Sequence, residues 1–239
     1  MASGGAIKVG ILETGDPPAN LELRFGRYLD MFQDLLGDRY RMTNYNVVGG
    51  SLPGAPEDED AYIVTGSPAG VYDPFQWIPE LKTFLRGAKG KAKLVGICFG
   101  HQVMAEAFGG RVEKSERGWG VGLQRYEVRE AAPWMDPVPS FAVPVSHQDQ
   151  VVEQPPHTRI LAANAFTPFG LLSYQDQPAI SFQCHPEFDP AYAEALIEHR
   201  RGRVPDPDAA IASLRLPNDR PLVAGWIRSF LDGSAAADA

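Results

Sequence analysis

Cysteine is scarce in this chain, whose 239 residues include only Cys98 and Cys184. Two thiols in a chain of this size do not form a disulfide framework, and no CxxC or HExxH spacing indicates a metal site. Long apolar runs are lacking too, since no stretch approaches the ~18 residues of a membrane-spanning helix. An export signal has a cationic segment followed by an apolar one, and the first fifteen residues have no such pattern. We therefore expect a soluble, cytoplasmic protein with reduced thiols, no metal, no cofactor and no membrane contact.

The chain also lacks an excess of positive charge. It carries 22 basic and 30 acidic side chains, a formal net charge of −8, which repels the phosphate backbone of a nucleic acid. One short basic cluster, EHRRGRVP at 198–205, stands out. A solvated helix end, whose cations offset the negative pole of the helix dipole, explains it better than a nucleic-acid contact. We expect no nucleic-acid partner.

Strand and helix patterns alternate in the first half. Short apolar or alternating runs predict strands, and apolar residues three or four apart predict helices, each helix ending near glycine. The expected strands are residues 7–13, 40–48, 60–70 and 93–98, the third of which ends in a glycine-rich turn. The expected helices are residues 21–36, 77–88 and 99–108. This order implies a parallel sheet covered on both faces, with functional sites at the carboxyl ends of its strands.

The second half changes character. GVGLQRYEV, SFAVPVS, RILAANA, FGLLSYQ and AISFQCH are short strands with little helix between them, which indicates added antiparallel pairing. We expect an α/β fold with a central, mostly parallel sheet flanked by helices and extended by antiparallel strands. One domain spans residues 1–239, with a C-terminal helical extension at about 190–231. That extension could cover a site, form a dimer contact or finish the core; we favour the last.

Cys98 stands at a strand-to-helix turn, in GICFG. Glycines two residues to either side suit a nucleophile elbow, where a sharp turn strains the central residue and side chains at the flanks would clash. The positive end of the following helix favours a thiolate there, and the backbone N–H of Phe99 could face an oxyanion. A buried structural cysteine explains the elbow equally well.

A nucleophile needs a base, and the chain offers histidines at 101, 147, 157, 185 and 199. We expect His157 and His199 on the surface, and His101 turned away from the sheet edge or packed beneath it. His185, in CHPEF, follows a strand directly. Because residues two apart can point the same way, Glu187 could hold its imidazole while the other ring nitrogen meets Cys98.

GICFGHQ together with CHPEF resembles the class I glutamine amidotransferases, which have a flavodoxin-like fold. VTGSPAGVYD is similar to the oxyanion turn of that family, and SHQDQV to another of its segments. The resemblance implies Cys98 as nucleophile, His185 as general base and acid, and Glu187 as the carboxylate that orients the histidine. It also implies Gln102 as a residue that binds glutamine.

Further site residues follow from the same resemblance. It implies an oxyanion turn at Gly66 and Ser67, where Ser67 replaces the usual glycine while its backbone N–H remains a donor. Trp119 lies in the stretch RGWGVG, where relatives contact the amino-acid end of the substrate. His147 and Asp149 are candidate pocket residues, and a turn capped by Asp149 is an equal alternative.

The implied activity is hydrolysis of the γ-carboxamide of glutamine, or of a γ-glutamyl compound, through a γ-glutamyl thioester. Because the chain contains no P-loop and no SGGxDS motif, it either acts alone or supplies ammonia to a separate synthetase subunit. A non-catalytic regulatory protein and a redox sensor built on Cys98 are the other hypotheses. We expect a small-molecule substrate, and a homo-oligomer is compatible with the sequence.

Overall fold

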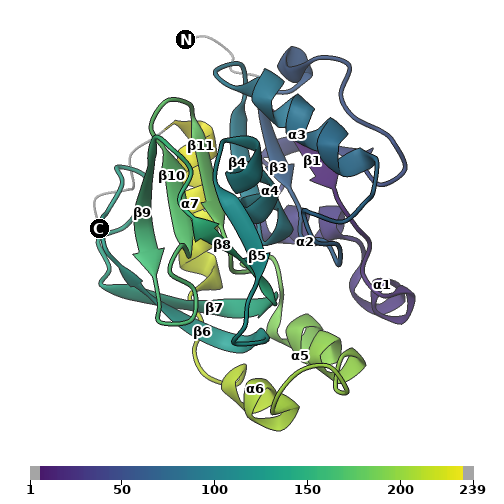
Figure 1. The fold of residues 1–239 in the computed structure, drawn as a ribbon, viewed down its shortest axis with the longest axis vertical. Helices are drawn as coiled ribbons and strands as arrows, with labels where there is room; N and C mark the ends of the chain where they lie inside the picture. Colours follow the sequence, from purple (N-terminus) through teal and green to yellow (C-terminus); the bar gives the residue numbers. More distant parts are fainter. Residues whose placement is uncertain (1–5, 234–239) are drawn as a thin grey trace.

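The computed structural model describes residues 6–233, which form a nine-stranded sheet with helices on both faces (Figure 1). The strand order is β2-β1-β3-β4-β11-β10-β9-β6-β7. These strands are β1 (Ile7–Glu13), β2 (Tyr40–Asn46), β3 (Ala61–Val64), β4 (Lys93–Ile97), β6 (Gly120–Val128), β7 (Ser140–His147), β9 (Thr158–Ala163), β10 (Leu171–Tyr174) and β11 (Ala179–Phe182). A second sheet pairs β5 (Arg111–Lys114) with β8 (Asp149–Glu153), two strands that the sequence patterns did not indicate.

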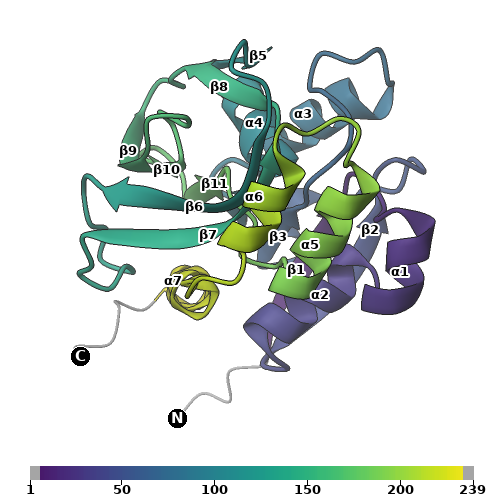
Figure 2. The same ribbon diagram turned by 90° about the horizontal axis from the view of Figure 1, so that it is seen from below.

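Helices cover the two faces of the large sheet with separate apolar cores. The helices are α1 (Ala19–Phe25), α2 (Tyr28–Leu36), α3 (Trp77–Ala88), α4 (Phe99–Ala107), α5 (Pro190–His199), α6 (Pro207–Ser213) and α7 (Arg220–Asp232), with a short 3₁₀ turn at Pro56–Asp58. On one face, Leu81 of α3 and Val103 of α4 pack with Tyr62 of β3. On the other face, α2 and α7 pack against the sheet (Figure 2). None of the helices in residues 6–233 has the length and apolar character needed to cross a membrane.

The pairing directions confirm the expected α/β fold. Neighbours from β2 to β11 run parallel, and neighbours from β11 to β7 run antiparallel. The strand AISFQCH, grouped by sequence with the antiparallel half, is β11 and pairs in parallel with β4. This pairing could not be predicted from local sequence, because six other strands lie between β4 and β11 along the chain. Since Ile97 pairs with Phe182, the carboxyl ends of β4 and β11 meet.

The single helix expected over residues 21–36 is wrong, because the structure has two. The first ends at Gly26, whose φ of +78° is in the left-handed region. The second begins at Tyr28, where the side chain of Asp30 accepts a 2.7 Å hydrogen bond from the backbone N–H of Arg27. A methyl group on Gly26 would lie 2.7 Å from that carboxylate, so the break requires glycine.

The last three helices have different surroundings. Helix α7 belongs to the central core, where Trp226 and Ile227 are fully buried. Of the C-terminal segment, α7 therefore completes the core. Helices α5 and α6 pack on each other and on α1 and β6 instead, below the sheet in Figure 1. Helix α5 begins just after residues 185–187, the HPE segment, and runs beside the carboxyl end of the parallel strands.

Candidate active site

Cys98 occupies a strained turn between β4 and α4. Its φ of 53° and ψ of −101° lie outside the regions that side chains normally adopt, and its side chain is 5 % exposed. A methyl group on Gly96 would lie 2.6 Å from the carbonyl oxygen of Gly100, and one on Gly100 would lie 2.2 Å from that of Val64. The expected clash at the flanks is thus present, and only glycine fits both positions.

His185 and Glu187 form a buried pair beside this turn. His185 Nδ1 lies 2.7 Å from Glu187 Oε1, and both side chains are almost completely buried. The ring of Phe188 stacks on the imidazole with centroids 3.8 Å apart. Burial alone would lower the pKa of His185, but the charges of Glu187 and Cys98 raise it above its ordinary value of 6.5. Since Glu187 holds Nδ1, Nε2 is the ring nitrogen left for Cys98.

Gly66 closes the site on the β3 side. A methyl group there would lie 2.9 Å from His185 Cε1 and 3.8 Å from Cys98 Cβ, so the bare backbone lets both groups approach. The hydroxyl of Thr14 donates to the carbonyl oxygens of Thr65 and Gly66 and holds this turn. Within residues 6–233, the backbone N–H groups expected to face an oxyanion, those of Ser67 and Phe99, have no hydrogen-bond acceptor.

A cavity of about 420 Å³ opens onto Cys98. Six of the ten candidate residues line it: Ser67, Cys98, Gln102, Trp119, His147 and Asp149. Gly66, Phe99, His185 and Glu187 are buried and do not line it. The side chain of Phe99 instead packs on Trp77, 5.4 Å between ring centroids, so only its backbone could take part. The ten candidate residues therefore lie around one site. Six of them form the wall of the cavity, and the other four are buried.

Polar residues of the cavity wall bind one another. The amide nitrogen of Gln102 donates to the backbone oxygen of Asp149, at 2.8 Å, and to the side-chain oxygen of Gln183. The Asp149 carboxylate accepts a 2.9 Å hydrogen bond from Tyr72, and burial raises its pKa. Burial lowers the pKa of His147 to about 4, which keeps this imidazole neutral near pH 7. Asp149 begins β8 and also lines the cavity, so it is more than the turn cap that the alternative interpretation expected.

The remaining histidines and the second cysteine lie as expected. His157 and His199 are exposed. His101 is fully buried, with Nδ1 2.8 Å from the hydroxyl of Ser181, and burial lowers its pKa to about 3. Cys184 is fully buried, and that burial raises the pKa of its thiol. Cys98 is therefore the only thiol that reaches the cavity among the residues described.

Comparison with known proteins agrees with this geometry. The family described as glutamine amidotransferase class-I matches residues 44–200, about two thirds of the chain. This chain belongs to the class I glutamine amidotransferase family. The matched region contains β3, the elbow, the cavity strands and the HPE segment.

Individual members of the family are similar over much of this chain. A glutamine amidotransferase-like protein of Schizosaccharomyces pombe is 29% identical, covering 81% of this chain and 84% of the relative. Gamma-glutamyl peptidase 2 of Arabidopsis thaliana is 28% identical over 73% and 72%. GMP synthase of Thermus thermophilus is 34% identical over 57% of this chain but 27% of its own length. A glutamine amidotransferase structure from Thermotoga maritima has the same fold, with a TM-score of 0.73, 15% identity and coverage of 96% and 98%.

The sequence did not indicate several residues that line the cavity: Tyr72, Asp73, Lys114, Ser146, Arg200 and Arg203. Tyr72 and Asp73 were within reach, because they follow the oxyanion turn directly in the quoted segment VTGSPAGVYD. Arg200 and Arg203 belong to the basic cluster that we interpreted as a solvated helix end. Arg201 fits that interpretation, since it pairs with Glu198 and Asp208. Arg200 and Arg203 contradict that interpretation, because they line the cavity. Their position depends on how α5 packs beneath the sheet, which the sequence does not show.

Proposed function

We propose that this protein is a cysteine-dependent amidohydrolase that cleaves the γ-carboxamide of glutamine or of a γ-glutamyl compound. The observation that carries the proposal is the 2.7 Å contact between His185 Nδ1 and Glu187 Oε1, buried beside the strained elbow of Cys98. A nucleophile, a base and a group that orients the base are the three parts of a covalent acyl-transfer site. The family membership supports the γ-glutamyl chemistry.

The reaction has two halves in this proposal. The Cys98 sulfur attacks the γ-carbonyl carbon, and the carbonyl oxygen takes negative charge next to the backbone N–H groups of Ser67 and Phe99. His185 donates a proton to the leaving nitrogen, the C–N bond breaks, and ammonia or an amine departs from a γ-glutamyl thioester. His185 then takes a proton from water, which attacks the thioester; the C–S bond breaks, and glutamate and the thiolate are released.

Glu187 has a defined part in this scheme. Its carboxylate raises the pKa of His185, so that the imidazole carries a proton at neutral pH when the thiolate attacks. It also fixes the ring so that the proton for the leaving group is on Nε2. Phe188 packs flat on the ring and restricts it to one plane. A protonated base beside a thiolate suits an amide, whose nitrogen must be protonated before it leaves.

Glutamate release tests the proposal. We expect the purified protein to release glutamate from glutamine, a γ-glutamyl peptide or a γ-glutamyl amide, and Cys98→Ala to abolish the release. Cys184→Ala is the matched control, because that cysteine is buried and outside the cavity. We also expect a glutamine-like electrophile to label the wild type and not Cys98→Ala. No turnover of any of the three compounds would contradict a stand-alone hydrolase. Labelling that survives in Cys98→Ala would contradict Cys98 as the nucleophile.

A second candidate function is a glutaminase subunit that supplies ammonia to a separate synthetase. It is favoured by the similarity to GMP synthase of Thermus thermophilus, of which this chain matches 27%. Glutaminase activity that rises only when a synthetase is added would support it over the stand-alone hydrolase. A regulatory protein without catalysis is the third hypothesis. Electrophile labelling of the wild type that is lost in Cys98→Ala would count against it. The cytoplasmic location stays a prediction.

A further inference from the structure

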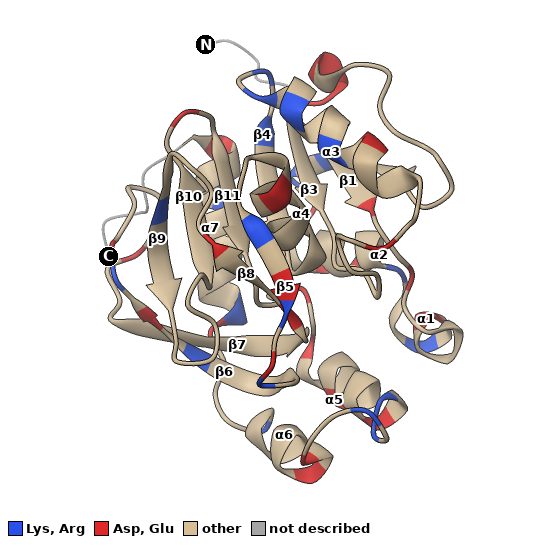
Figure 3. Ribbon diagram, viewed as in Figure 1, with Lys and Arg blue, Asp and Glu red and all other residues tan. Residues whose placement is uncertain are grey.

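The catalytic cavity has a basic wall that the proposed chemistry does not use. Arg200, Arg203 and Lys114 line the cavity that contains Cys98. Within residues 6–233, no carboxylate oxygen lies within 4 Å of these three cations. Figure 3 shows basic residues where α5 ends, and Arg201 among them is paired outside the cavity. Cations left unpaired beside a reactive thiol are available to a ligand.

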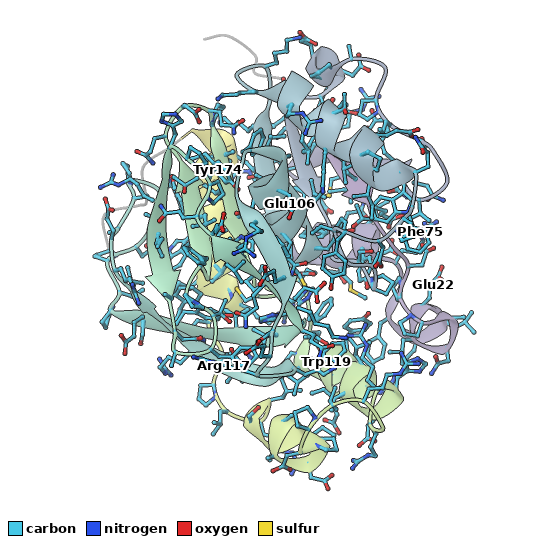
Figure 4. The ribbon with its side chains drawn as sticks, viewed as in Figure 1. Glu22, Phe75, Glu106, Arg117, Trp119 and Tyr174 are labelled. Carbon is cyan, nitrogen blue, oxygen red and sulfur yellow. The ribbon has the colours of Figure 1, made fainter. Side chains whose placement is uncertain are left out.

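Arg200 is held in position. Its Nη1 donates a 2.8 Å hydrogen bond to the hydroxyl of Ser146, and its guanidinium lies 5.5 Å from the ring centroid of Trp119. Trp119, labelled in Figure 4, lies between the strands and α5. These contacts fix one edge of a planar group, which leaves its other donors arranged as a fork that matches a carboxylate. A guanidinium fixed before binding loses little conformational entropy when a ligand arrives.

Arg203 reaches the same cavity through a turn. Its backbone N–H donates to the carbonyl oxygen of Arg200 at 2.7 Å, and this turn follows α5 directly. The side chain of Arg203 is exposed and has no hydrogen-bond or ion-pair partner among the residues described. Two arginines from one turn thus face the cavity, one fixed and one free to close on a ligand.

The charges of the cavity point to a substrate with an extra carboxylate. Three cations face two carboxylates, those of Asp73 and Asp149, so the wall has one positive charge in excess. The amino-acid end of a glutamyl group is a zwitterion and adds no net charge. Glutamine is therefore neutral overall, whereas a γ-glutamyl peptide carries one further carboxylate in its leaving group. Charge complementarity favours the peptide.

We propose that Arg200 and Arg203 bind a carboxylate in the leaving group, which makes γ-glutamyl peptides the preferred substrates. The inference rests on the proposed γ-glutamyl hydrolase function. The basic turn after α5 is then a specificity site, and the two arginines contact the part of the substrate that departs as an α-amino acid or a shorter peptide.

Two substrates that differ only in this carboxylate test the inference. γ-Glutamylglycine has it, and γ-glutamyl ethylamide lacks it. We expect the wild type to have a higher kcat/KM for γ-glutamylglycine, and Arg203→Gln to lower the ratio of the two values about tenfold or more, mainly through the KM of the peptide. Arg200→Gln is expected to act in the same direction. Arg201→Gln, which removes a neighbouring charge outside the cavity, is the control and should leave the ratio unchanged.

Two outcomes overturn the inference while the proposed function stands. An unchanged ratio in both arginine variants would remove their role, and an equal loss with both substrates would assign them to the glutamyl end instead. If the wild type hydrolyses neither compound, the proposed function fails, and binding then decides the inference. In that case calorimetry compares γ-glutamylglycine binding to Cys98→Ala with and without Arg203→Gln. Equal affinities would reject the carboxylate site, and a weaker affinity in the double variant would support it.

Discussion

At Cys98 the backbone holds a conformation that non-glycine residues rarely adopt, with φ of 53°. Such a conformation costs about 1–3 kcal/mol and persists only where the surrounding structure imposes it. Here the hydrogen bond from the Cys98 N–H to the carbonyl oxygen of Phe182, 2.8 Å, ties the turn to the strand that precedes His185. The strained turn therefore holds the sulfur close to the strand end that carries His185, the proposed base.

Gly66→Ala tests how closely these groups must approach. The added methyl would lie 2.9 Å from His185 Cε1, so the imidazole must move away from Cys98. We expect kcat/KM to fall on the order of a hundredfold, with little change in the midpoint of urea unfolding. Gly87→Ala is the matched control, because Gly87 is exposed on α3 and a methyl group there meets no atom closer than 3.9 Å. Equal activity of the two variants would show that His185 does not depend on this approach.

Glu187→Gln tests the orienting carboxylate through the pH profile. In the wild type the pKa of His185 is raised, so activity that needs the protonated imidazole persists at neutral pH and is lost as the pH rises through that pKa. Without the carboxylate, burial still lowers the pKa of His185 while the charge of Glu187 no longer raises it, so the pKa falls relative to the wild type. We expect the alkaline limb of kcat/KM to move to lower pH, and activity at pH 7 to fall on the order of 10²–10⁴-fold. Glu194→Gln, on the exposed side of α5, is the control. An alkaline limb that stays in place would exclude this role.

The residues that could be predicted from the sequence are those fixed by short local patterns. The elbow and the HPE segment each place a side chain at a strand end, and the pair of His185 with Glu187 follows from residues two apart. The arginines of the cavity could not be predicted, because a charged turn is expected to face solvent. Only the packing of α5 shows that Arg200 and Arg203 line the cavity. The roles of Gln102 and Trp119 in binding stay predictions, although both line the cavity.

Among the elements, α7 has a contact that links the C-terminal segment to the site. Arg220, at its first position, donates from Nε to the carbonyl oxygen of Pro186 at 2.8 Å and from Nη2 to that of Glu187 at 3.3 Å. The remainder of α7 is anchored in the core by Trp226. The helix thus holds the HPE segment from behind while it completes the core.

Arg220→Ala removes both hydrogen bonds to the HPE segment. Hydrogen bonds from a charged group contribute about 1.5–3 kcal/mol each, so we expect a measurable loss in the free energy of unfolding. We also expect a lower kcat with a nearly unchanged KM, and partial recovery in Arg220→Lys, because the residue positions Glu187 without lining the cavity. Arg215→Ala, an exposed residue of the preceding segment, is the control. A fall in stability without any fall in kcat would contradict the positioning role.

Element types were more predictable than their pairing. The strands and helices of the first half follow from apolar periodicity, except where Gly26 divides α1 from α2. The strands β5 and β8 were missed because they pair only with each other, and most of their residues are not buried. The neighbour of β11 is set by a connection that crosses the whole antiparallel half, which no local pattern contains. Tertiary packing, rather than propensity, decides the pairing of these strands, whereas the break at Gly26 is local.

For the whole molecule, buried neutral histidines determine how stability depends on pH. The pKa values of His101 and His147 are lowered by burial to about 3 and about 4, below the ~6.5 of an unfolded chain. Between pH 6.5 and 4 the unfolded state therefore binds protons that the native state does not, and the free energy of unfolding falls as pH falls. His185 has the opposite sign, since its contribution is complete below pH 6.5 and is lost only as pH rises through its raised pKa.

Urea unfolding at pH 7 and pH 5 measures this effect. We expect lower stability at pH 5, and a smaller difference between the two pH values in His101→Gln, which removes one of the two groups. His157→Gln, an exposed histidine, should leave the difference as in the wild type. The same difference in all three proteins would mean that His101 is not the source of the acid sensitivity.

In the proposed reaction, Cys98 carries the γ-glutamyl group between the two halves. Rapid acid quenching during turnover, followed by peptide mass spectrometry, measures this directly. We expect a mass increase of one glutamyl group on the peptide that contains Cys98, present in the wild type and absent in Cys98→Ala. Glutamate release with no such adduct, or with an adduct on another residue, would contradict it.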